Sequence, residues 1–159
     1  MISSSEDDSI KIFDVEGRKQ LHHFKDAHKS DSSRQTLHLT TSSTGRICTI
    51  AVSQNGLFLA SGSQDKSIKV FDLTTKKEIH HFVDAHDGNK KLFQATYFPP
   101  IGEIFSIAIS PDNKFVVSGS GDKSIKIFDL ETSKPIYHFT DAHDGKFLLK
   151  FIHISTSCR

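Results

Sequence analysis

One ten-residue phrase occurs three times in this 159-residue chain and is the feature that most restricts its fold. It reads SEDDSIKIFD at 5–14, SQDKSIKVFD at 63–72 and SGDKSIKIFD at 120–129. The copies are 58 residues apart (14 to 72) and 57 residues apart (72 to 129), and each is followed by the triplet Asp-Ala-His. Self-similarity at one period indicates a repeat architecture, in which each copy is a structural unit packed on its neighbour.

Composition excludes several classes of partner and site. The 20 basic and 19 acidic residues nearly balance and form no basic block, so a nucleic-acid partner is not expected. No apolar run reaches the roughly 18 residues of a membrane span, and the start, MISSSEDDS, is too acidic for a secretory signal. Cys48 and Cys158 do not follow the repeat, which favours free thiols over a disulfide and predicts a reducing, cytoplasmic location.

Each repeat has the pattern of four short antiparallel strands. Residues 47–52 alternate and are β-branched, and residues 62–66 (GSQDK) are a predicted turn, as is Gln54-Asn55-Gly56. No helical periodicity occurs, so the sequence predicts an all-β fold built from four-stranded sheets of the propeller-blade type. The strands are predicted at 47–52, 57–61, 67–71 and 79–82, and again at 104–109, 114–118, 124–128 and 135–139.

The repeat resembles the WD40 repeat family. That family has a Gly-His pair near the start of each repeat, Trp-Asp near its end and an Asp in the turn before the third strand. The pair reads Ala-His in this chain and the Trp-Asp position reads Phe-Asp, as in Phe71-Asp72. The resemblance implies a partial β-propeller, and it covers most of the chain apart from extra residues in each repeat.

The resemblance also implies a hydrogen-bond network in each blade, made by the His, a strand-two Ser, the turn Asp and the Trp position. Phenylalanine has no indole N–H, so we expect three members to remain hydrogen-bonded, with the serine hydroxyl finding another acceptor. The same residue types could suggest a hydrolytic triad, but recurrence in every blade favours a structural role. The network residues are His28, Ser61, Asp65 and Phe71 in one blade, and His86, Ser118, Asp122 and Phe128 in the next.

Each repeat is roughly 15 residues longer than the usual 40–45 of the family. The surplus lies at 29–46 and 87–103, where we predict β-hairpins that use the following strand, extended backward, as their second arm. The second insert is apolar and is a candidate partner surface; the alternative is that its side chains pack on the neighbouring hairpin and form a small core there. The candidate residues are Leu92, Phe93, Tyr97, Phe98 and Ile101.

The repeat register divides the chain into four parts. Residues 1–28 form a partial first blade, 29–86 an insert and second blade, 87–143 an insert and third blade, and 144–159 the start of a further insert. Since a closed ring needs four or more blades, three explanations stay open. The chain is a segment of a larger propeller, or it completes a ring with other copies or another chain, or it stands alone as an open array.

The sequence predicts a noncatalytic scaffold for protein–protein contacts, with other proteins, copies of itself or the remainder of a propeller as partners. A propeller enzyme with a site in its central channel, and a purely architectural subunit, are the alternatives. No cofactor or metal is expected, because the paired histidines at 22–23 and 80–81 point to opposite faces of their strands and no carboxylate or cysteine motif accompanies them.

Overall fold

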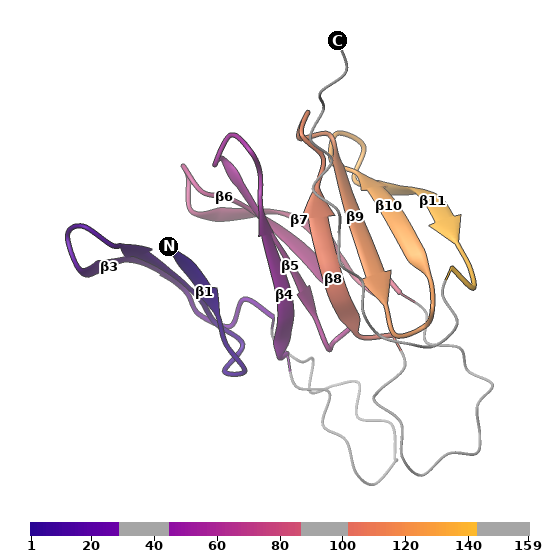
Figure 1. The fold of residues 1–159 in the computed structure, drawn as a ribbon, viewed down its shortest axis with the longest axis horizontal. Coiled ribbons are helices and arrows are strands. Elements are labelled where there is room, and N and C mark those ends of the chain that lie inside the picture. The colour runs from indigo at the N-terminus through magenta and orange to yellow at the C-terminus, as the bar shows by residue number, and fades with distance from the viewer. Residues whose placement is uncertain (29–44, 87–101, 143–159) are drawn as a thin grey trace, which may run out of the picture.

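The computed structural model describes residues 1–28, 45–86 and 102–142, which form three antiparallel sheets of consecutive strands (Figure 1). This confirms the all-β prediction of WD40-type meanders, although the described residues form no closed propeller. The first sheet contains β1 (Ile2–Ser4), β2 (Ile10–Asp14) and β3 (Lys19–Phe24). The second contains β4 (Ile47–Val52), β5 (Phe58–Ser63), β6 (Ile68–Asp72) and β7 (Lys77–Phe82), and the third β8 (Ile104–Ile109), β9 (Phe115–Ser120), β10 (Ile125–Asp129) and β11 (Lys134–Phe139).

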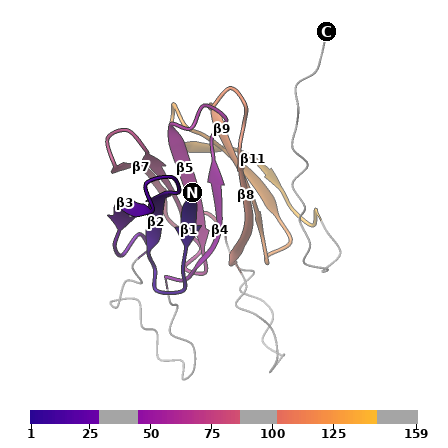
Figure 2. The same ribbon diagram turned by 60° about the vertical axis from the view of Figure 1, so that its left-hand side comes forward.

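The hydrophobic core lies between the sheets, which pack face to face with the second sheet between the other two (Figures 1 and 2). The two central strands of the second sheet, β5 and β6, are buried at most positions because sheets lie on both sides of them, whereas most residues of the outer strand β7 are exposed. One cluster joins the first and second sheets through Ile10, Ile12, Phe24, Ala27, Ile47, Leu59 and Phe71. The other joins the second and third sheets through Ala60, Ile68, Val70, Phe82, Ala85, Ile104, Ile107, Val116, Phe128 and Leu130.

Strand β6 contributes side chains to both faces of the second sheet. In β6, Ile68 and Val70 pack toward the third sheet, whereas Phe71 packs toward the first. The pairing of β6 with β7 shifts register between Val70 and Phe71, and the same shift occurs at Ile12/Phe13 and Ile127/Phe128. A β-bulge at this point adds twist to the sheet. The repeated Phe therefore marks a repeated bulge.

Strand β5 continues two residues beyond its predicted end. The sequence placed Gly62 and Ser63 in a turn, but they pair with β4 and Gly62 also pairs with β6. A Cβ atom on Gly62 would lie 2.5 Å from Cγ2 of Ile104 in the third sheet. Glycine is therefore present because a neighbouring sheet approaches closely, not because the backbone turns. The prediction of a turn at 62–66 was wrong in its first two residues.

The inner strands β4 and β8 begin at Ile47 and Ile104, without the predicted backward extension into the two preceding residues. The carbonyls of Arg46 and Glu103 accept hydrogen bonds from the amides of Gln64 and Gly121 at 2.9 and 3.0 Å, so each bonds to the turn between the second and third strands of its own sheet. The rest of both predicted hairpins, and the candidate partner surface of Leu92, Phe93, Tyr97, Phe98 and Ile101, lie outside the described residues. No helix in the described ranges is long and apolar enough to cross a membrane.

Candidate functional site: repeated His-Ser-Asp networks

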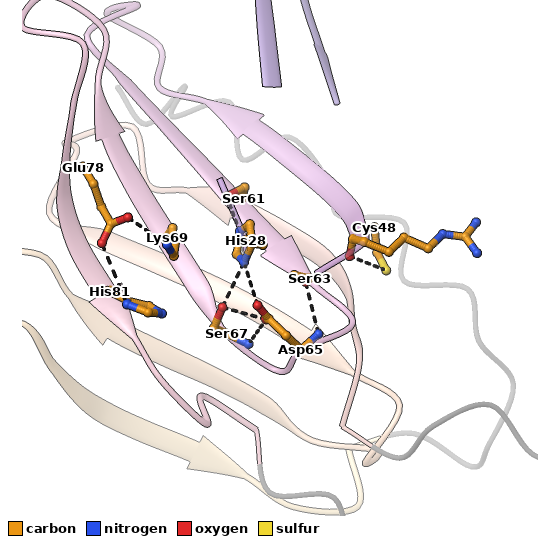
Figure 3. A network of polar contacts seen from close by, with 10 residues as sticks. His28, Cys48, Ser61, Ser63, Asp65, Ser67, Lys69, Glu78 and His81 are labelled. Carbon is orange, nitrogen blue, oxygen red and sulfur yellow. Dashed lines mark hydrogen bonds and ion pairs between the residues drawn. The ribbon is translucent and has the colours of Figure 1, made fainter. Parts of the chain in front are cut away.

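His28 lies at the end of the loop that follows β3 and inserts into the second sheet, where it is fully buried (Figure 3). Its Nε2 lies 2.7 Å from Oγ of Ser61 on β5. Its Nδ1 lies 2.9 Å from Oγ of Ser67 and 3.3 Å from Oδ2 of Asp65, in the turn between β5 and β6. One imidazole from the first sheet's loop is thus held by three side chains of the second.

The bonding pattern assigns the hydrogen atoms of this network. The Ser67 hydroxyl donates to Oδ1 of Asp65 at 2.6 Å, so its oxygen accepts from Nδ1–H of His28. Nε2 is then the acceptor for the Ser61 hydroxyl. The serine hydroxyl therefore finds its acceptor on the imidazole, and no member of the network is left without a partner.

The third sheet contains the same arrangement around His86, which is also fully buried. Its Nε2 lies 2.7 Å from Oγ of Ser118, and its Nδ1 lies 2.9 Å from Oγ of Ser124 and 3.2 Å from Oδ2 of Asp122. The two networks have the same members, at nearly the same distances, in two different sheets.

The structure brings together six of the eight residues that the sequence assigned to the networks, and adds two serines. Phe71 and Phe128 do not hydrogen-bond; each packs against the last aromatic residue of the preceding sheet, with ring centroids 4.7 Å (Phe24) and 4.6 Å (Phe82) apart. Ser67 and Ser124 were missed by sequence reasoning. The signal was present, because the spacing Ser-x-Asp-x-Ser occurs in all three copies of the repeated phrase.

Comparison with known proteins agrees with this geometry. The family model described as "WD domain, G-beta repeat" matches residues 33–72 and 94–129, each of which ends at the Phe-Asp pair of a third strand. The chain belongs to the WD40 repeat family.

Similar proteins carry the repeat within much longer chains. WD repeat protein iqw1 of Schizosaccharomyces pombe is 35% identical over 95 residues, covering 59% of this chain and 10% of that protein. The general transcriptional corepressor tupA of Dictyostelium discoideum is 33% identical over 98 residues, covering 62% of this chain and 15% of that protein. Protein HIR1 of Candida albicans is 28% identical over 125 residues, covering 67% of this chain and 14% of that protein. This chain therefore spans a small part of the length of each.

The WD40 networks hold their carboxylates in the ionised form. Burial of Asp65 opposes ionisation, but the hydrogen bonds that its carboxylate accepts from His28 and Ser67 outweigh burial and lower the pKa of Asp65 from 3.8 to about 2. In the third sheet burial again opposes ionisation, and bonds from His86 and Ser124 hold the pKa of Asp122 well below its usual range. Both carboxylates therefore stabilise the fold while ionised.

We expect acid to weaken the fold through these two groups. The folded-state pKa of Asp65 lies below its unfolded value, so its contribution is complete above about pH 4 and is lost as the pH falls toward about 2. That loss should amount to about 2 kcal/mol of unfolding free energy. Urea unfolding at a series of pH values measures how steeply the free energy of unfolding falls with decreasing pH. Asp65→Asn should make the free energy of unfolding depend less on pH between about 4 and about 2. An unchanged pH dependence would show that Asp65 does not cause the loss of stability in acid.

The paired histidines have separate surroundings within the described residues. His22 packs edge-on against Phe24, and Nδ1 of His80 lies 2.8 Å from Oγ of Ser133 in the neighbouring third sheet. No group of three or more His, Cys, Asp or Glu side chains in the described ranges could hold a metal ion.

A cavity of about 530 Å³ lies at the ends of the inner strands, beside Arg46, Cys48 and Glu103. Burial raises the pKa of the free Cys48 thiol, which therefore stays protonated and is a weak nucleophile at neutral pH. Burial also raises the pKa of Glu103, whose carboxylate accepts a hydrogen bond from Gln64. An ion pair between Arg46 and Glu6 crosses from the second sheet to the first at 2.5 Å. These contacts connect neighbouring sheets.

Proposed function

We propose that this chain is a noncatalytic scaffold for protein–protein contacts. The observation that carries the proposal is the burial and duplication of its only Ser-His-Asp groupings among the described residues. His28, His86, Ser61 and Ser118 each have no exposed surface. A nucleophile must reach its substrate, and these hydroxyls lie between packed sheets.

The hydrogen bonds of the networks support a structural role. Each imidazole comes from the loop of one sheet and is bonded by three residues of the next, so each network fixes the position of two neighbouring sheets. A rigid row of sheets holds its surface loops at defined positions, which suits recognition of another protein.

The proposal extends to the apolar insert, with Leu92, Phe93, Tyr97, Phe98 and Ile101 as the contact surface. A few buried side chains supply most of the binding energy at protein interfaces, and tyrosine is enriched among them. WD40 repeats generally mediate protein binding, and one of the similar proteins is named as a transcriptional corepressor. The partner proposed here is another protein, in contact through this insert.

Affinity capture with a substituted surface tests the proposal. The unchanged chain should retain a partner protein in stoichiometric amount. We expect a chain with these five residues changed to serine to retain at least about tenfold less of that protein. A matched control changes five exposed apolar residues of the described sheets to serine and should retain that protein. The control residues are Leu21, Val52, Leu57, Ile79 and Val83. Equal capture by all three chains, or no stoichiometric partner for any, would refute the contact surface.

A further inference from the structure

Strands β6 and β7 of the second sheet hold a row of three polar side chains (Figure 3). Nζ of Lys69 lies 2.9 Å from Oε2 of Glu78, and Nδ1 of His81 lies 3.8 Å from Oε1 of the same carboxylate. Lys69 pairs with His81 across the two strands, so both side chains point to one face of the sheet. Glu78 lies on that face too, because the register shift pairs it with Phe71, two residues from Lys69. One carboxylate thus lies between a lysine and a histidine.

The third sheet has the same lysine and histidine without the carboxylate. Strands β9, β10 and β11 pair in the same registers as β5, β6 and β7, so Lys126 and His138 stand at the positions of the lysine and histidine in that row. The position of Glu78 is taken by Pro135, which has no acidic group. We call Lys126 and His138 the third-sheet pair.

Lys126 points into the contact between the second and third sheets. It lies opposite Ser118, which bonds to His86 from the loop of the second sheet, and opposite residues of an antiparallel pair share a face. Lys126 is 9% exposed, and no acceptor in residues 1–28, 45–86 or 102–142 lies within hydrogen-bond or ion-pair distance of its ammonium. The unpartnered atoms that are shut off from solvent in these ranges belong to other residues, so the ammonium reaches the surface.

The position of the missing carboxylate is accessible between two packed sheets. In the second sheet, the side chains of Glu78 and His81 are 38% and 39% exposed although the first sheet covers that face. The equivalent position beside the third-sheet pair is therefore expected to be open to a group from outside the chain.

Lys126 is prepared to bind such a group. An exposed ion pair is usually weak because two long side chains must be ordered to form it. The stem of Lys126 is already fixed by burial, so less side-chain entropy remains to be lost when a carboxylate arrives. The ammonium has only water as its partner among the described residues, and a charge-assisted hydrogen bond to a carboxylate is stronger than a neutral one.

We propose that the third-sheet pair binds a carboxylate of an acidic protein segment, which takes the place that Glu78 holds in the second sheet. Nζ of Lys126 donates a hydrogen bond to the ligand carboxylate, and His138 attracts it at longer range when protonated. Pro135 supplies no competing carboxylate. The ligand is a carboxylate because the same chain places one between the same two residue types. This site is separate from the apolar insert, so a failed capture experiment leaves it untouched and the reverse also holds.

Nuclear magnetic resonance of the labelled full chain tests the site. The probes are a blocked tetrapeptide of glutamates, the matching tetrapeptide of glutamines, and glutarate as a free dicarboxylate. We expect the glutamate peptide to shift the Lys126 side-chain and His138 ring signals with a dissociation constant on the order of 1 mM, and the glutamine peptide to shift neither. Tighter binding of the glutamate peptide than of glutarate supports a protein segment. Equal binding would overturn that choice and assign the site to a free carboxylate.

Reciprocal substitutions distinguish this site from general attraction between charges. Lys126→Met keeps the buried stem and should raise the dissociation constant at least about tenfold. Pro135→Glu should have the same effect, because the chain then supplies its own carboxylate. Glu78→Ala should open a second site, at which the Lys69 signals shift on titration although they do not in the unchanged chain. Lys114→Met, which removes an exposed lysine in the turn between β8 and β9, should leave binding unchanged.

Circular dichroism and thermal melting show whether each variant is folded. Pro135 and Glu78 are exposed, so these two substitutions keep the test valid if Lys126→Met fails to fold. The absence of any shift at Lys126 would overturn the proposal. Binding that survives both Lys126→Met and Pro135→Glu, or equal shifts at all lysines, would also overturn it.

Discussion

Replacing His86 with alanine should lower the free energy of unfolding by about 3 kcal/mol, the largest effect expected for any single side chain of the networks. The substitution removes a fully buried ring and leaves a cavity between the second and third sheets. It also leaves Asp122, whose side chain is 5% exposed, without its partner at 3.2 Å. A buried carboxylate that loses its donor is costly, because water cannot replace the bond.

Urea unfolding of the full chain measures this loss, with His138→Ala as the matched control. His138 lies on the exposed outer strand β11, and its substitution should change the unfolding free energy by no more than about 0.5 kcal/mol. The double variant His86→Ala with Asp122→Ala should cost less than the sum of the single changes by about 1–2 kcal/mol, since the residues are in contact. Equal destabilisation by His86→Ala and His138→Ala would show that the network adds nothing to stability.

The strands were predictable from sequence because each repeat contains its own alternation and its own turn residues. The predicted spans 47–52 and 104–109 agree with β4 and β8 at both ends. Both segments are rich in β-branched residues, and local pattern alone determines such a strand. The predicted order of four consecutive strands per sheet is likewise confirmed for the second and third sheets.

The geometry of the networks was only partly predictable. Family resemblance supplied His28, Ser61 and Asp65, but a family pattern shows which residue types recur and not which atoms meet. Ser67 receives the Nδ1 hydrogen bond because the tight turn brings its hydroxyl between Asp65 and the ring. The position of the Ser67 hydroxyl depends on the left-handed backbone conformation of Lys66, which has a φ angle of 71°. Lysine rarely adopts this conformation, so the sequence of the turn does not predict it.

Gly62 shows how tertiary packing overrides a local signal. Within its own repeat the glycine indicates a turn, because glycine is the residue most often found where the backbone reverses. The reason for its presence lies 42 residues further along the chain, where Ile104 begins the third sheet. Contacts of this kind between repeats have no local pattern, so sequence reasoning about one repeat cannot find them.

Gly62→Ala should therefore lower the free energy of unfolding by about 2 kcal/mol, although alanine is intrinsically better than glycine within a strand by about 0.5–1 kcal/mol. The added Cβ would lie 2.5 Å from Cγ2 and 3.0 Å from Cβ of Ile104, and 3.0 Å from Cγ2 of Thr49. Ile104 cannot move far, because it is fully buried between the sheets. The sign of the effect thus decides whether close packing of the sheets or strand propensity dominates at this position.

Thermal and urea unfolding of three further variants establish the cause. Gly17→Ala is the matched control, since its Cβ would meet only the end of the Asp14 side chain, which can rotate away; a change within about 0.5 kcal/mol is expected. Ile104→Ala alone should cost about 2–5 kcal/mol through the cavity it leaves. Combined with Gly62→Ala it should cost at least about 1 kcal/mol less than the sum, because the alanine methyl group then occupies part of that cavity. Strict additivity, or stabilisation by Gly62→Ala, would show that the second and third sheets are not held at the close distance that this glycine permits.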